Sequence, residues 1–193
     1  MKDRNVSSVR WRITVRDKSG KVIEQKEGKG DSVLDNWIKL FESIKTGTAW
    51  TPNDTSGSSC SISNLAITSC AGHAPAGDDD YGILVGTGTD PVDITDYQLA
   101  SKISHGTGSG QLSYGETSSY TDGSGLQQDR GMQRSFDNNS GADITIKEIG
   151  MVLKINDGSS DYYIMVMRDV ISDTTVPNGG RVTIEYWFRW NPS

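Results

Sequence analysis

The strongest constraint on the fold is a nine-residue run near the C-terminal end in which apolar and polar residues alternate. The run follows the turn-forming segment Pro177-Asn178-Gly179-Gly180. Its apolar side chains are Val182, Ile184, Tyr186, Phe188 and Trp190. Successive side chains on a β-strand point to opposite faces, so a period of two places this whole set on one face. The run predicts a strand with one face in a hydrophobic core.

The N-terminal segment shows the same period of two. Its apolar set is Val9, Trp11, Ile13 and Val15, and its opposite face carries Arg10, Arg12 and Arg16. Residues 17–20 form a turn signal, so residues 21–25 are expected to return as the hairpin partner. The arginine face is compatible with anion binding, but a solvated strand face or a subunit contact is favoured.

Residues 32–46 carry the one convincing helical pattern in the chain. Val33, Trp37, Phe41 and Ile44 recur at helical spacing, which predicts an amphipathic helix. Ser32 with Asp35 three residues later forms a weak N-terminal cap pattern, and Gly47 stands where a helix is expected to end. The aromatic stripe is expected to pack over a sheet edge or against a neighbouring subunit, in preference to forming a ligand groove.

Turn-forming residues separate weaker signals between the helix and the last strands. Residues 47–80 are rich in Ser, Thr, Gly and Asp, which predicts a long irregular loop with a short strand near residues 61–68. A loop of this length in a compact domain is usually functional or ordered by a partner. Asp90-Pro91 predicts a short helical turn. Further strands are expected at residues 81–87, 111–114, 131–136 and 162–170.

A change of phase at Glu148 predicts a β-bulge and, through it, a buried ion pair. Ile144 and Ile146 share one parity, and Gly150 lies beside the switch to the other, which is shared by Ile149, Met151, Leu153 and Ile155. In the run 162–170, which is apolar on both faces and therefore expected to be a central strand, Arg168 shares the parity of apolar residues. A buried guanidinium requires an acidic partner. We therefore predict a partly buried Glu148–Arg168 ion pair that is structural and fixes the register of this sheet.

These patterns together define the expected fold class. Eight to ten short strands, one helix and no alternation of strands with helices indicate an all-β, antiparallel, jelly-roll-like sandwich. No period of 20–50 residues repeats, which excludes solenoids and propellers. A chain of 193 residues fits one domain, so residues 1–193 are expected to form a single sandwich.

Composition limits the classes of partner. The net charge of −6 argues against nucleic-acid binding, which requires a basic surface. The longest apolar run has six residues, Tyr162 to Met167, so no membrane partner is expected, and no apolar segment of a secretory signal follows Met1. The hydrophobic content of 34% is low for a globular chain and favours a subunit that gains stability from its neighbours.

No pattern of catalytic residues emerges, and we expect no enzyme activity, no cofactor and no metal. His73 and His105 lie in loop contexts without metal-ligand spacing. The segment Gly86-Thr87-Gly88 lacks the rest of a dinucleotide-binding motif. Two acidic loops have carboxylates that could bind Ca²⁺, but we favour the interpretation that both are solvated loops without a metal ion. These loops are Asp78-Asp79-Asp80 and the set Asp90, Asp93 and Asp96.

The aromatic residues and the cysteines leave alternatives open. Trp50, Tyr114, Tyr120 and Trp187 are the aromatics that a sugar-binding sandwich would use for stacking, although core packing or subunit contacts are favoured. Cys60 and Cys70 match no zinc pattern. Free thiols in a reducing compartment are favoured over a disulfide across a hairpin.

The order of motifs also resembles that of a known family. The motifs are Gly82-Ile83-Leu84-Val85-Gly86-Thr87-Gly88-Thr89, Asp96-Tyr97-Gln98-Leu99, Arg134-Ser135-Phe136, Asn138-Asn139-Ser140-Gly141, Ile144-Thr145-Ile146-Lys147-Glu148-Ile149-Gly150, Arg168-Asp169-Val170, Val176-Pro177-Asn178-Gly179 and Val182-Thr183-Ile184-Glu185-Tyr186. They resemble those of virion structural proteins of tailed bacteriophages, of the minor-head, decoration or tail-fibre-like kind. The resemblance extends through Trp11 to Phe41 and is weakest over residues 48–80.

The resemblance implies a non-enzymatic virion component that is made in the host cytoplasm. Its partners would be other virion proteins, and it would form a homo-oligomer, with a trimer favoured. An outer-surface position, as a head decoration protein or a tail-associated protein, is expected. A carbohydrate- or receptor-binding module is the alternative, and the family supplies no catalytic residues to carry over.

Overall fold

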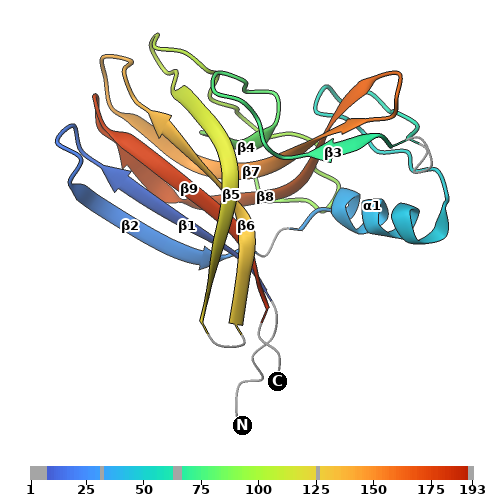
Figure 1. Cartoon of the computed structure of the whole chain (residues 1–193). Coiled ribbons are helices and arrows are strands. Elements are labelled where there is room, and N and C mark those ends of the chain that lie inside the picture. The colour runs from blue at the N-terminus through green and yellow to red at the C-terminus, as the bar shows by residue number, and fades with distance from the viewer. Residues whose placement is uncertain (1–7, 31–32, 63–66, 125–126, 191–193) are drawn as a thin grey trace.

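A computed structural model describes residues 8–30, 33–62, 67–124 and 127–190. In these residues nine strands form two antiparallel sheets, and one α-helix lies beside them (Figure 1). The elements are β1 Ser8–Arg16, β2 Val22–Lys29, α1 Asp35–Thr46, β3 Ser69–Ala71, β4 Gly82–Gly86, β5 Ser113–Ser124, β6 Gln127–Asp137, β7 Ile144–Asn156, β8 Asp161–Val176 and β9 Arg181–Trp190. The predicted β-sandwich with one helix in the N-terminal half is confirmed.

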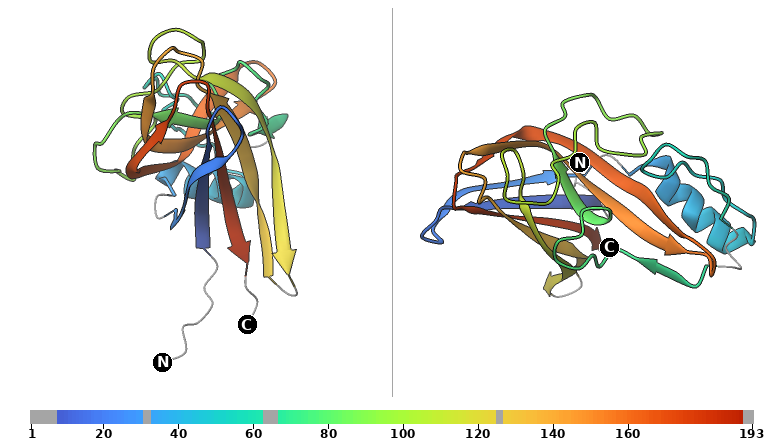
Figure 2. Two further views of the ribbon diagram at one scale, coloured as in Figure 1. Left: turned by 90° about the vertical axis from the view of Figure 1, so that its left-hand side faces the viewer. Right: turned by 90° about the horizontal axis from the view of Figure 1, so that it is seen from above.

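Successive pairs of strands alternate between the two sheets. The larger sheet has the order β2-β1-β9-β6-β5. In the smaller sheet β7 is central, with β8 along one side and both β3 and β4 along the other. The chain thus enters the larger sheet with β1 and β2, returns to it with β5 and β6, and closes it with β9 between β1 and β6. The strands at the two ends of the described chain therefore pair with each other, and Figure 2 shows β1 and β9 side by side.

The alternating run at the C-terminal end forms the centre of the larger sheet. Val182, Ile184 and Tyr186 are buried between the sheets, as their shared parity predicts. Phe188 and Trp190 continue the same face but are exposed. Figure 1 shows why, because the ends of β5, β6 and β9 continue past the smaller sheet, which diverges toward α1. The apolar face of β9 is therefore longer than the sheet that covers it.

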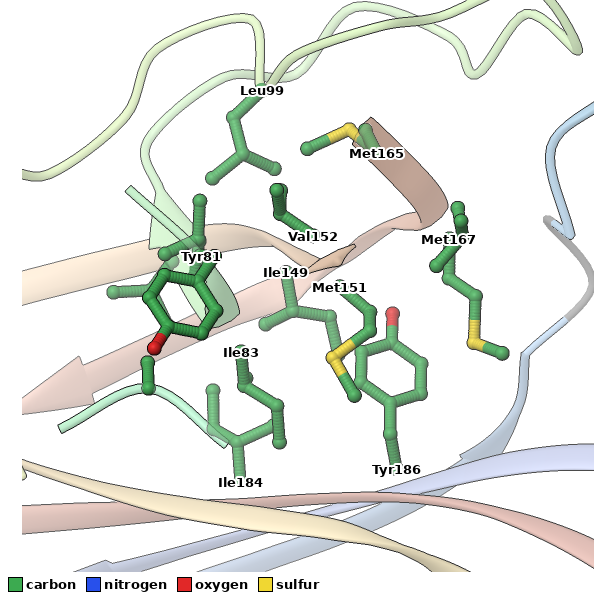
Figure 3. Close-up of a cluster of buried hydrophobic side chains, with 14 of the residues drawn as sticks. Tyr81, Ile83, Leu99, Ile149, Met151, Val152, Met165, Met167, Ile184 and Tyr186 are labelled. Carbon is green, nitrogen blue, oxygen red and sulfur yellow. The ribbon is translucent and has the colours of Figure 1, made fainter. Parts of the chain in front are cut away.

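The smaller sheet contains the predicted bulge. The register of β7 against β8 shifts between Ile146 and Glu148. A second shift, between Met151 and Val152, was not predicted. Figure 3 shows the two faces of this sheet, with Met151 turned toward the larger sheet and Val152 turned toward the loop that covers the other face.

The prediction that β8 is a central strand is wrong. Among the named strands β8 pairs only with β7, so it lies at an edge of the sheet. Its residues 164–169 are nevertheless all buried, because the larger sheet covers one face and the loop that carries Leu99 packs near Met165 on the other (Figure 3). Burial on both faces therefore does not distinguish a central strand from a covered edge strand.

Helix α1 covers part of the β8 edge, as expected for an amphipathic helix beside a sheet. The Leu34 N–H donates to the Val166 carbonyl, and the Asn36 side-chain amide donates to the Met165 carbonyl at 3.1 Å. The helix begins at Asp35 with Leu34 in the capping position and no side-chain cap, and the predicted cap Ser32 lies outside the described residues. Gly47 ends the helix in the left-handed conformation, at φ 75°, as predicted.

The weaker predictions have mixed outcomes. Residues 47–80 are largely irregular, but the short strand expected near residues 61–68 lies instead at β3, and residues 63–66 are outside the description. The helical turn predicted after Asp90-Pro91 is wrong, because this segment is irregular and its polar groups are bound by Arg168. The strands expected at 111–114 and 131–136 form a much longer hairpin, β5–β6.

Candidate functional site

Glu148 and Arg168 form a buried ion pair in the smaller sheet. Arg168 Nε donates to Glu148 Oε2 at 3.0 Å, and both side chains are almost completely excluded from solvent. The contact crosses β7 and β8 diagonally, because Glu148 lies opposite Val170 and Arg168 lies opposite Gly150. The predicted contact and its position at the bulge are therefore confirmed, while its control of register remains a prediction.

The Glu148 carboxylate also holds a neighbouring loop through its backbone. It accepts N–H groups from Gly88 at 3.0 Å, Ala100 at 3.0 Å and Ser101 at 2.7 Å. A Cβ atom at Gly86 or Gly88 would lie 2.4 Å from Glu148 Oε1, closer than any real contact. This close approach explains the Gly-Thr-Gly segment without a bound nucleotide.

The other side of the Arg168 guanidinium binds the loop that contains Asp90, Asp93 and Asp96, one of the two acidic loops considered as Ca²⁺ sites. Arg168 Nη1 donates to Asp96 Oδ2 at 2.7 Å, and Nη2 donates to the Asp90 carbonyl at 3.0 Å. Burial lowers the pKa of Arg168, but the hydrogen bonds that it donates to Asp96 and Glu148, together with their negative charges, outweigh burial, and the net shift of the pKa is upward. Asp93 faces its own loop, where its carboxylate accepts from Thr95. The cation in this loop is thus an arginine side chain.

Arg134 forms a second buried cationic centre that the sequence analysis missed. Its guanidinium donates to five backbone carbonyls, those of Gly115, Tyr81, Ile83, Pro75 and Asp78. It also lies 4.7 Å from the centre of the Tyr114 ring. Desolvation lowers the pKa of Arg134. Arg134 shares its strand face with the apolar residues Met132 and Phe136. The parity argument that predicted a buried Arg168 could therefore also have predicted a buried Arg134.

Three of the four aromatics considered for sugar stacking are buried, which agrees with the favoured interpretation of core packing and leaves these three unable to stack on a sugar. Trp50, Tyr114 and Trp187 are 5%, 3% and 1% exposed. Trp50 is enclosed where its backbone pairs with Ile62, and the Tyr114 hydroxyl donates to the Ile103 carbonyl. Trp187 lies on the outer face of the larger sheet, where Arg12, Arg189 and Tyr120 lie against its ring. Tyr120 alone is partly exposed, with its ring centre 5.4 Å from that of Trp187.

The arginine face of β1 is occupied by carboxylates and aromatic contacts. Arg12 donates to Glu185 at 3.1 Å and lies 5.2 Å above the Trp187 ring. Arg10 and Arg12 both approach Glu27, at 3.5 and 3.7 Å. These pairs support the reading of a solvated, self-neutralised strand face.

The remaining candidate residues do not assemble into a catalytic or metal centre in the part of the chain that the structure describes. No group of three or more metal-ligating side chains occurs there. Asp79 pairs with Lys102 at 3.3 Å and accepts the His105 N–H. His73 Nε2 lies 2.9 Å from Ser119 Oγ, but both residues are exposed and, within the described ranges, no carboxylate is bonded to the other His73 nitrogen. Cys60 and Cys70 are both free thiols, and desolvation raises the pKa of Cys60 to about 11.

The most distinctive surface lies where the two sheets diverge. Trp37 of α1 stacks on Phe188 of β9 with ring centres 5.7 Å apart, and it meets Phe41 edge-on at 4.9 Å. The exposed apolar side chains around this aromatic series are Ile38 (54%), Phe41 (55%), Ile44 (59%), Phe188 (40%) and Trp190 (60%). Together with Trp37 they are called the α1 surface below.

An apolar cavity opens beside the α1 surface. It measures about 250 Å³, and its lining includes Trp37, Met132, Met151, Met167, Tyr186 and Phe188. Figure 3 shows Met151 and Met167 on either side of the Tyr186 ring, on the inner side of the smaller sheet. Methionine side chains adapt readily to different neighbours, so this end of the core can repack around an apolar group. Sequence reasoning identified the aromatic stripe on the helix but not this opening.

A shallow polar hollow lies on the outer face of the larger sheet. Its volume is about 390 Å³, and its lining includes Glu116, Ser118, Gln133, Ser135, Asp137 and Arg181. Arg181 and Asp137 form a two-point ion pair there, at 2.6 and 2.9 Å. Tyr120 follows Ser118 on the same face of β5, two residues along the strand.

Comparison with protein-family models, with curated proteins and with solved structures found no match for this chain. Among the described residues, none of the helical structure has the length and apolar character that crossing a bilayer requires. Function must therefore be argued from the surfaces and contacts of the chain itself.

Proposed function

We propose that this chain is a non-enzymatic structural component of a tailed-bacteriophage virion. It acts through protein–protein assembly on the outer surface of the particle, as a head decoration, minor capsid or tail-associated protein. The resemblance of its motifs to those of virion proteins suggests the particle, and the α1 surface is the observation that supports assembly.

The distribution of side chains supports this role over catalysis. Three of the buried ionisable side chains, Glu148, Arg168 and Arg134, bind backbone groups or each other and hold loops to the sandwich. The buried Asp129 and Asp169 are likewise engaged, with Arg189 and with the Tyr186 hydroxyl. With about 200 Å² for a large apolar side chain, the exposed fractions on the α1 surface amount to roughly 500 Å². This is as large as the largest apolar patch on a typical monomer, and such patches commonly mark interaction sites.

The virion role is tested by locating the protein in purified particles. Particles of a phage that carries this sequence are banded on a density gradient, and the chain is quantified against the major capsid protein by mass spectrometry. A fixed copy number that persists through high-salt washing is expected. Absence from the particles would refute the proposed role. A Phe41→Glu variant, supplied in place of the native chain, is expected to be incorporated less.

Carbohydrate or receptor binding is the alternative, and the polar hollow beside Tyr120 is the observation that favours it. Sugar sites combine an aromatic face with polar side chains that bind hydroxyl groups. A glycan array probed with the purified chain would give reproducible hits that Tyr120→Ala abolishes. An array without hits would remove this alternative and leave the assembly role unaffected.

A further inference from the structure

We propose that a second copy of this chain covers the α1 surface, with the two α1 helices packed antiparallel about a two-fold axis that passes near Phe41. This inference rests on the assembly role proposed above and names the partner and the geometry. The proposed assembly is a two-fold symmetric dimer, in place of the trimer that the sequence analysis favoured.

The exposed apolar residues of α1 are arranged symmetrically along the helix. Phe41 lies near the middle of Asp35–Thr46, and Ile38 and Ile44 lie three residues before and after it. A two-fold axis through Phe41 therefore places Ile38 of each copy against Ile44 of the other, and the two Phe41 rings against each other. In such an interface each surface is complementary to itself, as symmetric dimers require.

The charges of α1 are complementary in the same arrangement. The first turn carries Asp35 and the last turn carries Lys45. Antiparallel helices bring the first turn of one copy beside the last turn of the other. Each Asp35, which pairs with Lys39 of its own helix, therefore also approaches Lys45 of the second copy. The helix dipoles are also oppositely directed in this packing, which is favourable. A parallel arrangement would bring like charges together at both ends.

The area of the α1 surface fits one side of a dimer interface. A typical stable interface buries about 800 Å² on each partner, with an apolar centre and a polar rim. The α1 surface supplies roughly 500 Å² of apolar area, and Lys39, Glu42 and Lys45 on the same helix supply the rim. Phe188 and Trp190 extend the apolar centre from the helix onto β9, so two elements from each copy take part.

Sedimentation velocity of the full chain tests the proposal. The wild-type chain is expected to be a dimer at about 100 μM, and Phe41→Glu is expected to weaken the dimer roughly 30-fold or more. Ile44→Glu, at the last turn of the helix, serves as a second variant if Phe41→Glu does not fold. Ile23→Glu is the matched control, because Ile23 is equally exposed but lies on β2. A monomeric wild-type chain, a trimer, or a dimer that Phe41→Glu leaves intact would each overturn the inference.

Charge reversal tests the antiparallel geometry separately. Asp35→Lys alone and Lys45→Glu alone each place two like-charged contacts in the dimer, so each variant is expected to dimerise about tenfold more weakly at low salt. An equimolar mixture of the two variants restores opposite charges across both contacts and is expected to recover the wild-type affinity. A mixture no tighter than either variant would overturn the antiparallel arrangement. A monomeric wild-type chain that is nevertheless incorporated into particles would refute the dimer and preserve the virion role.

Discussion

Removing the negative charge of Glu148 is expected to destabilise the fold more than any conservative change on the surface. Glu148→Gln keeps the volume of the side chain but leaves the buried Arg168 guanidinium with only Asp96 as an ionic partner. The carboxylate currently accepts four hydrogen bonds, from Arg168 and from three backbone N–H groups. Each carboxylate oxygen accepts two of these bonds, so the N–H₂ group of Gln faces two donors in either orientation and both contacts become repulsive.

The size of the effect follows from the burial of the pair. Breaking a buried ion pair by removing one partner costs about 3–5 kcal/mol, because an uncompensated charge remains in the interior. The free energy of unfolding of a small protein is about 5–15 kcal/mol, so Glu148→Gln is expected to remove a large part of the stability of this chain. Glu148→Asp retains the charge but withdraws it by one methylene, and an intermediate loss is expected. The double variant Glu148→Gln/Arg168→Met removes both charges and is expected to cost less than the two single variants added together.

Urea unfolding at neutral pH, followed by tryptophan fluorescence and circular dichroism, measures these losses. Asp137→Asn is the matched control, since Asp137 pairs with Arg181 on the exposed face of the larger sheet at a similar distance. An exposed pair contributes well under about 1 kcal/mol, so this control is expected to unfold almost as the wild type does. If Glu148→Gln loses no more free energy of unfolding than Asp137→Asn, the buried pair does not stabilise the sheet and our reasoning is wrong.

Three further predictions concern other buried contacts. Arg134→Lys is expected to lose about 2–3 kcal/mol in urea unfolding, because three ammonium donors cannot replace a planar group that binds five carbonyls; an unchanged midpoint would contradict this. Gly88→Ala is expected to lose about 1–3 kcal/mol in urea unfolding, because its Cβ would lie 2.4 Å from Glu148 Oε1; an unchanged midpoint would contradict this. Burial and the nearby Asp169 raise the pKa of Tyr186 above its usual value, so the unfolded chain releases this proton first. Stability is therefore expected to be complete below about pH 10 and to fall above it, with a smaller slope in Tyr186→Phe; equal slopes in titrated unfolding curves would refute this.

The sequence predicted the structure well where apolar side chains had to lie on one face of a strand. The alternation from Val182 to Trp190 located the strand β9, and the change of phase at Glu148 located a bulge. The buried pair followed from parity, since an arginine among apolar neighbours on one strand face requires a partner. Such arguments succeed because the period of a strand is two, so a shift of one residue moves every side chain to the other face.

The sequence was uninformative where burial comes from irregular segments. Strand β8 is covered on both faces although it lies at an edge, and Trp50 is enclosed by its own loop. The β5–β6 hairpin extends well beyond its weak signal, because Ser and Thr residues can form a strand with one solvated face without producing an apolar period. Which loop covers which surface depends on contacts between residues distant in the chain, and no local pattern encodes them.

The α1 surface arises from a mismatch between two patterns that the sequence states clearly. The apolar face of β9 continues through Phe188 and Trp190, but the smaller sheet covers it only as far as Tyr186. The helix likewise buries Leu34 and Leu40 and leaves Phe41 and Ile44 in contact with solvent. The apolar faces of two separate elements, α1 and β9, are thus longer than the parts that this monomer buries, and both exposed parts lie at the same end of the sandwich. A second covering surface is the simplest way to use both, and the symmetric spacing about Phe41 is what favours a second copy as its source.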